Sequence, residues 1–216
     1  MAENTAGLRG ITAGETALCT VGQEGTGLTY CGYDIHDLAA NAEFEEVAYL
    51  LLHKQLPTAA ELASYRSRLQ GLRHLPQALR DVLERIPADA HPMDVMRTGC
   101  SMLGNLETEQ DFSEQDQHID RLLSAFPGII TYWYRYSHHG EQIDTDSDEE
   151  SIGGHFLKLL HGKKPSDLHV KVMHASLILY AEHEFNASTF TARTCASTLS
   201  DLHSCITGAI GTLRGP

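Results

Sequence analysis

Residues 177–190 read LILYAEHEFNASTF, and this stretch guides the interpretation of the whole chain. An apolar run leads to His183, which stands between Glu182 and Glu184 and is followed by small hydroxyl and amide residues. The apolar positions before His183 follow the spacing of three and four residues that marks one face of a helix. We therefore expect a helix whose C-terminal end carries His183. Charged groups buried there would cost free energy without polar partners, so the stretch indicates a ligand site or a well-satisfied core.

His183 admits two interpretations on chemical grounds alone. A protonated imidazole donates from both ring nitrogens, which suits a carboxylate or a keto acid, and the flanking glutamates favour the charged form. Alternatively, His183 is a core histidine satisfied by Glu182 or by a main-chain carbonyl, because such histidines also occur in structural networks. The residues themselves leave both interpretations open.

The remaining sequence predicts an all-α, multi-helix bundle that begins with a short β-hairpin. Glycines recur between Leu8 and Tyr33 around two short strand-like runs, which predicts a hairpin with a glycine-rich turn. Apolar periodicity and capping residues predict helices over 34–55, 58–72, 77–87, 89–103, 119–136, 151–161, 166–183, 188–193 and 200–213.

Three local features of these helices are testable. In the 34–55 helix, Glu43, Glu45 and Glu46 are expected to face outward. Pro127 lies inside the 119–136 segment and predicts a kink or a break. The small residues Gly208, Ala209 and Gly211 in the last helix permit close contact with a neighbouring helix.

Composition excludes several classes of function. With 29 Asp+Glu against 16 Lys+Arg, the formal charge of -13 argues against a nucleic-acid partner, which requires a basic face. No run approaches the roughly 18 apolar residues of a membrane-spanning helix, and residues 1–10 lack the features of a signal peptide. The five scattered cysteines include no C-x-x-C pair. We expect a cytoplasmic protein that binds neither nucleic acid nor membrane.

No metal site is expected. Asp144, Asp146 and Asp148 are spaced like the start of a calcium loop, but Glu149 replaces the required glycine and His155 stands where a bidentate glutamate belongs. The acidic run 141–150 is therefore interpreted as a solvated loop. Thirteen histidines are present without an H-E-x-x-H motif, which argues against a zinc site.

Several blocks in one order resemble the citrate synthase family, and most closely its 2-methylcitrate synthases. The resemblance covers almost the whole chain. For the 2-methylcitrate branch, it rests chiefly on SIGGHFL at 151–157 and YWYRYSHHGE at 132–141. The other blocks are FEEVAYLLLH at 44–53, HPMDVMRT at 91–98, YAEHEFNASTFT at 180–191 and GAIGTLRGP at 208–216. One departure is Cys31, where the family usually has arginine.

The resemblance implies specific roles and boundaries. His183 would bind oxaloacetate, with Asn186 close to the same site. The two catalytic histidines, the catalytic aspartate, the carboxylate-binding arginines and most of the coenzyme A pocket would lie beyond Pro216. Residues 1–33 would form the hairpin segment and 34–216 a truncated helical large domain, with the small catalytic domain absent. The resemblance also implies a homodimer formed by antiparallel helices.

The implied reaction condenses propionyl-CoA with oxaloacetate and water to give 2-methylcitrate and coenzyme A. No cofactor is expected, since acyl-CoA is a substrate, and the 216-residue chain alone is expected to be an inactive fragment. One alternative is a citrate synthase that uses acetyl-CoA. Alternatives of other classes are a non-catalytic helical module that binds a carboxylate or a protein, and a zinc-dependent hydrolase.

Overall fold

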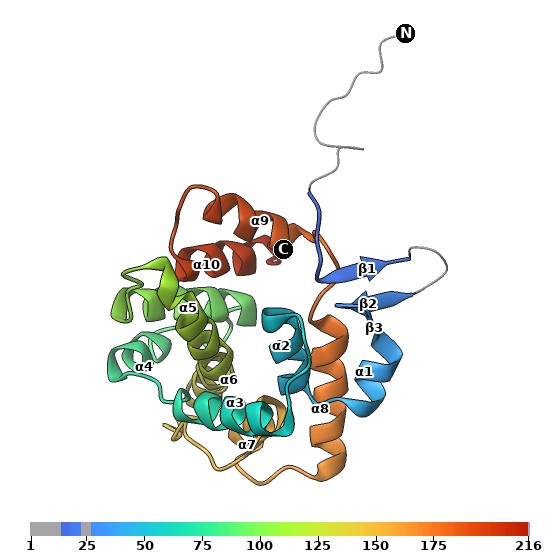
Figure 1. Ribbon diagram of the computed structural model, residues 1–216. Coiled ribbons are helices and arrows are strands. Elements are labelled where there is room, and N and C mark those ends of the chain that lie inside the picture. Colours follow the sequence, from blue (N-terminus) through green and yellow to red (C-terminus); the bar gives the residue numbers. More distant parts are fainter. Residues whose placement is uncertain (1–13, 23–26, 216) are drawn as a thin grey trace.

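The computed structural model describes residues 14–22 and 27–215 (Figure 1). Helices dominate these residues, and a small sheet precedes them, so the all-α fold with a short N-terminal β element is confirmed. The strands are β1 (Cys19–Val21), β2 (Leu28–Tyr30) and β3 (Tyr33–Asp34). The helices are α1 (Ile35–Asn41), α2 (Phe44–His53), α3 (Ala59–Gly71), α4 (Gln77–Leu83), α5 (Pro92–Leu106), the 3-10 helix η1 (Phe112–Glu114), α6 (Gln115–His139), α7 (Ile152–His161), α8 (Asp167–Tyr180), α9 (Ala187–Ala196) and α10 (Leu202–Thr212).

The N-terminal sheet is antiparallel, in the order β1-β2-β3. Cys19 pairs with Tyr30, and Tyr30 pairs in turn with Tyr33. The third strand extends the predicted hairpin. The predicted start at Leu8 and the tip of the glycine-rich turn, residues 23–26, lie outside the described residues.

Two main apolar cores hold the described part of the chain together, and a small third cluster joins α2, α3 and α7 through Ala48, Tyr65, Leu69 and Ile152. The larger core joins α4, α5 and α6, and partly buried residues of α10 pack against it. The smaller core joins the sheet, α1 and α2 to Ile178 of α8. Figure 1 shows α9 and α10 side by side at one end of the molecule, where α10 contacts both α9 and α5. The sheet thus packs on α8, and α10 packs on the helices of the larger core.

The predicted helix over 34–55 is two helices, so the single-helix prediction is wrong. Ala42 and Glu43 are extended, with φ/ψ of -102°/158° and -94°/159°. The Glu43 side chain accepts from the Glu46 N–H, and Glu46 accepts from the Glu43 N–H at 2.8 Å. This reciprocal capping box starts α2 afresh.

Glu45 does not face outward, contrary to prediction. Its side chain is fully buried, and Oε1 accepts a 2.6 Å hydrogen bond from the N–H of Ile152. That N–H belongs to the first turn of α7 and has no partner within the helix. Glu45 therefore joins α2 to the start of α7.

Pro127 does not break its helix. α6 runs without interruption from Gln115 to His139, and Thr131 donates to the Pro127 carbonyl at 2.6 Å. Much of α6, including Pro127 itself, is buried. Tertiary packing compensates for the hydrogen bond that proline removes.

The acidic segment 141–150 has no helix or strand, as predicted, and Arg73 holds it in place. The Arg73 side chain is 1% exposed. Its guanidinium donates to the main-chain oxygens of Ser147, Glu149 and Ser151 at 3.1, 2.6 and 3.3 Å. A single buried cation thus anchors the segment through its backbone.

Hydropathy adds one negative finding. Among the helices of residues 14–22 and 27–215, none is both long and apolar enough to span a bilayer.

Candidate functional site

His183 lies on a connection between two helices. α8 ends at Tyr180, so the prediction that its helix reaches His183 is wrong, whereas α9, which begins at Ala187, confirms the helix predicted over 188–193. The Asn186 Oδ1 accepts from the N–H of Thr189 at 2.7 Å and so caps α9. Glu184 adopts a left-handed conformation with φ of 68°, which a helix cannot accommodate. Residues 181–186 are called the His183 connection below.

The structure brings the two predicted binding residues together. His183 is exposed, and its Nε2 lies 3.1 Å from the Asn186 Nδ2. If the amide donates, a neutral His183 accepts at Nε2 and keeps Nδ1–H as a donor. The pair then offers an N–H to an acceptor such as a carboxylate or a ketone oxygen.

The glutamates that flank His183 contact the N-terminal sheet. Glu182 Oε1 accepts from the Cys19 thiol at 3.5 Å, and Glu184 Oε1 accepts from the Val21 N–H at 3.3 Å. Within the described residues, no hydrogen bond or ion pair joins either carboxylate to His183. Their role in this geometry is to attach the connection to β1.

Two side chains of the sheet complete this attachment. The hydroxyl of Tyr30 donates to the Ile178 carbonyl at 2.9 Å and accepts from the Glu182 N–H at 3.2 Å. The Cys19 sulfur accepts from the Glu184 N–H at 2.8 Å. Burial, reinforced by the Glu182 charge, raises the pKa of Cys19 to about 12, so this sulfur is a neutral thiol.

The sequence does not predict that Tyr30 and Cys19 hold the His183 connection. The one nearby feature that the sequence analysis singles out is Cys31, in the Tyr-Cys-Gly-Tyr segment at 30–33, where the family usually has arginine.

A positively charged side chain, Arg193, lies beside the His183 connection. The Arg193 guanidinium lies 4.8 Å from the centre of the Phe185 ring, which is the geometry of a cation–π contact. Arg193 belongs to α9, so the helix that Asn186 caps also carries this positive charge.

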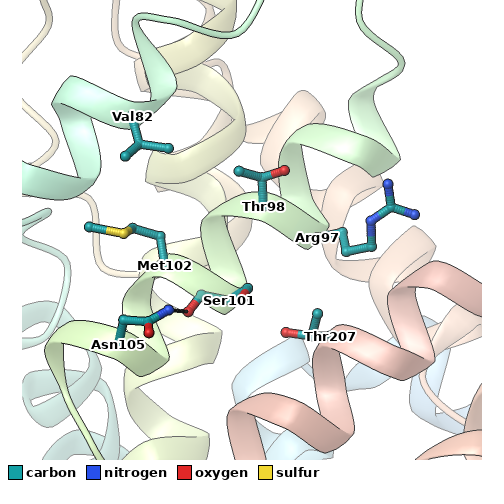
Figure 2. Close-up of a pocket in the computed structure, with 7 residues that line it drawn as sticks. All are labelled: Val82, Arg97, Thr98, Ser101, Met102, Asn105 and Thr207. Carbon is teal, nitrogen blue, oxygen red and sulfur yellow. Dashed lines mark hydrogen bonds between the residues drawn. The ribbon is translucent and has the colours of Figure 1, made fainter.

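A pocket elsewhere in the molecule is separate from this site. It has a volume of about 400 Å³ and lies between α4, α5 and α10 (Figure 2). Arg97 at its edge is paired with Asp94 at 2.9 Å. None of its lining residues belongs to the His183 connection; they are Val82, Arg97, Thr98, Ser101, Met102, Asn105 and Thr207.

One group of described side chains has the composition of a metal site. Ligand atoms of Glu43, Glu45 and His174 lie within 4.8 Å of one another. However, Glu43 is ion-paired with Arg66, and the Nδ1 of His174 accepts from the Phe44 N–H at 2.9 Å. The Glu43 carboxylate and the His174 Nδ1 are thus engaged with protein donors, whereas the Glu45 Oε2 has no hydrogen-bond partner among the described residues. That the chain binds no metal stays a prediction.

Known proteins resemble this chain over nearly its whole length. Residues 7–216 match the family model described as "Citrate synthase, C-terminal domain". The 2-methylcitrate synthase of Shewanella oneidensis is 74% identical over 211 residues, which are 98% of this chain and 56% of that protein.

Two solved structures share the fold. Citrate synthase from Thermotoga maritima aligns with a TM-score of 0.83 and 32% identity over 97% of this chain and 55% of that one. Citrate synthase from Thermoplasma acidophilum, in a ternary complex with carboxymethyl coenzyme A and oxaloacetate, aligns with a TM-score of 0.89 and 27% identity over the same shares.

The helical architecture is thus that of citrate synthases of known structure. The chain belongs to the citrate synthase family. It spans about half the length of the curated relatives that it matches.

Proposed function

We propose that this chain is part of a 2-methylcitrate synthase. Such an enzyme condenses propionyl-CoA with oxaloacetate, and hydrolysis of the thioester releases 2-methylcitrate and coenzyme A. The observation that carries the proposal is the 74% identity to the S. oneidensis 2-methylcitrate synthase over 98% of the chain.

In this proposal His183 binds oxaloacetate. Its ring offers an N–H to a carboxylate or ketone oxygen, and Asn186 holds the ring at 3.1 Å. The exposure of His183 supports a role in binding, because a satisfied core histidine would be buried.

The remaining chemistry is assigned to groups outside the 216 residues. A base removes the proton alpha to the thioester, and histidines stabilise the enol and polarise the ketone. We propose that residues 34–216 are part of the large helical domain and 1–33 its hairpin segment. The two histidines and the aspartate of the reaction then belong to a small domain. Acyl-CoA is a substrate, and no metal or organic cofactor is needed.

We also propose that the protein forms a homodimer. A groove of about 470 Å³ lies between η1, α9 and α10, and its lining includes Phe112, Leu199, Leu202 and Ile206. Phe112 is 51% and Leu199 is 74% exposed. Large apolar side chains grouped around one groove support a contact with a second copy of the chain.

The proposal is tested with a chimera in which this chain replaces the matching part of the S. oneidensis enzyme. Release of coenzyme A thiol is measured with oxaloacetate and either propionyl-CoA or acetyl-CoA. The chimera is expected to turn over faster with propionyl-CoA, and the 216-residue chain alone is expected to be inactive. Faster turnover with acetyl-CoA would instead define a citrate synthase.

The role of His183 is tested in the same chimera. His183→Ala is expected to weaken oxaloacetate binding about 10- to 100-fold, because a hydrogen bond to a charged group is lost. His139→Ala, at the exposed end of α6, is the control and should leave binding unchanged. Unchanged oxaloacetate affinity in His183→Ala would refute the assignment.

A further inference from the structure

The end of α8 is fixed by a side chain from the N-terminal sheet. Tyr30 is completely buried, and its ring belongs to the same apolar cluster as Leu50 and Ile178. Its hydroxyl donates to the Ile178 carbonyl in the last turn of α8 and accepts from the Glu182 N–H just beyond the helix. One oxygen atom therefore sets the direction in which the chain leaves α8.

A second anchor lies two residues further along. The N–H of Glu184 donates to the Cys19 sulfur at 2.8 Å, and the Glu184 carboxylate accepts from the Val21 N–H at 3.3 Å. Residues 182 and 184 are thus both attached to the sheet, while the side chain of His183 between them is exposed. The backbone of His183 is held from both sides.

These contacts fix the backbone of the His183 connection, as the regular hydrogen bonds of a helix would otherwise do. A helix fixes the direction of each side chain through its regular backbone, but the His183 connection is irregular. Glu184 holds a left-handed conformation that is unfavourable for a non-glycine residue and persists only when surrounding contacts impose it. The orientation of His183 therefore depends on the sheet.

We infer that Tyr30 is a positioning residue that orients His183, through the main chain of Glu182, toward a ligand carrying carboxylate and ketone oxygens. This inference rests on the proposed function for the identity of that ligand, oxaloacetate. Tyr30 itself is buried beneath the connection and acts only through His183.

The test compares Tyr30→Phe with Tyr33→Phe. Tyr30→Phe keeps the buried ring and removes only the hydroxyl. Tyr33→Phe removes a hydroxyl from a side chain that is 43% exposed in the same sheet and serves as the matched control. Two quantities are measured: the NMR signal of the His183 imidazole in the 216-residue chain, and the oxaloacetate Kd of the chimera.

The expected result is specific to Tyr30. Tyr30→Phe should shift or broaden the His183 signal, accelerate hydrogen exchange at the Glu182 amide, and weaken oxaloacetate binding about tenfold or more. Tyr33→Phe should match the unsubstituted protein in all three measurements. Cys19→Ala removes the sulfur that accepts from the Glu184 N–H and keeps the contact of Glu184 with Val21. It should shift the His183 signal and weaken oxaloacetate binding in the same direction, and it replaces Tyr30→Phe if Tyr30→Phe does not fold.

The outcomes separate this inference from the proposed function. An unchanged His183 signal and unchanged oxaloacetate Kd in Tyr30→Phe, or in Cys19→Ala where that variant replaces it, would overturn the inference. If the unsubstituted chimera does not bind oxaloacetate, the proposed function fails. The His183 signal then still decides whether Tyr30 orients the histidine.

Discussion

His155 is a histidine held in the interior in its neutral form. It is fully buried in α7, and its Nδ1 lies 2.9 Å from the Ser147 hydroxyl. Burial lowers its pKa to about 3, and the charges of Arg73 and Lys158 act in the same direction. An unfolded histidine titrates near 6.5. At a pH between these two pKa values, His155 is protonated in the unfolded chain and neutral in the folded chain.

This difference makes stability depend on pH. As the pH falls from 6.5 toward 3, proton uptake favours the unfolded state, so the free energy of unfolding decreases. Between pH 7.5 and 5.5, His155 should account for a loss of about 1.4 kcal/mol. Urea unfolding at both pH values should show this extra loss in the unsubstituted chain relative to His155→Gln.

The matched control for this measurement is His161, which lies exposed at the other end of α7. His161→Gln should keep the full pH dependence. If His155→Gln and His161→Gln lose the same stability on acidification, burial of His155 is not the cause.

At the level of elements, the close contact between α5 and α10 depends on Gly104, because glycine has no side chain. A Cβ added to Gly104 would stand 2.6 Å from the Cβ of His203, which is closer than real Cβ contacts. On α10, Gly208 faces Cys195 of α9, and Gly211 faces Arg97 of α5. The predicted close contact of the last helix with its neighbours is therefore confirmed.

Gly104→Ala should destabilise the fold by about 1–3 kcal/mol, because the two helices must move apart. Gly71→Ala should instead stabilise it by about 0.5 kcal/mol, since a Cβ on this last residue of α3 would meet no atom within 4 Å. Thermal or urea unfolding of both variants measures the difference. Equal effects of the two substitutions would contradict the close packing of α5 on α10.

Helix starts were predictable where the capping residue is a common one. The helix starts predicted at 58, 151 and 200 lie within two residues of the observed ones, because the caps Thr58, Ser151 and Asp201 are local hydrogen bonds of preferred residue types. The start of α2 was missed, since Glu43 is not a preferred N-cap residue and no glycine or proline marks the turn.

Contacts between distant residues could not be predicted. Glu45 faces inward because of an N–H that lies 107 residues later, and the Tyr30 hydroxyl meets an N–H 152 residues later. No local pattern specifies such partners. For the same reason, the prediction that His183 and Asn186 bind substrate rests on family resemblance, and the residues that hold their connection were not predicted at all.

For the molecule as a whole, we predict that the proposed homodimer forms through the groove around Phe112. Phe112→Ser should weaken dimerisation at least about tenfold, because an apolar anchor is lost from a buried contact. Sedimentation velocity over a range of concentrations measures the dimer dissociation constant. Leu168→Ser removes a similarly exposed apolar side chain from α8 and should leave association unchanged. A chain that stays monomeric, or equal weakening by both variants, would refute this interface.

The way in which Arg73 holds residues 147–151 has a consequence for protein engineering. The guanidinium donates to three main-chain oxygens, which every amino acid provides, and to one side chain, the Ser147 hydroxyl at 3.4 Å. Apart from Ser147, the anchor therefore does not use the side chains along the acidic segment. Exposed positions such as Asp144 and Asp146 are therefore suitable places for a fluorophore or an affinity label. Arg73 itself cannot be replaced by lysine without losing this anchor, because the lysine ammonium lacks the planar set of N–H donors of the guanidinium.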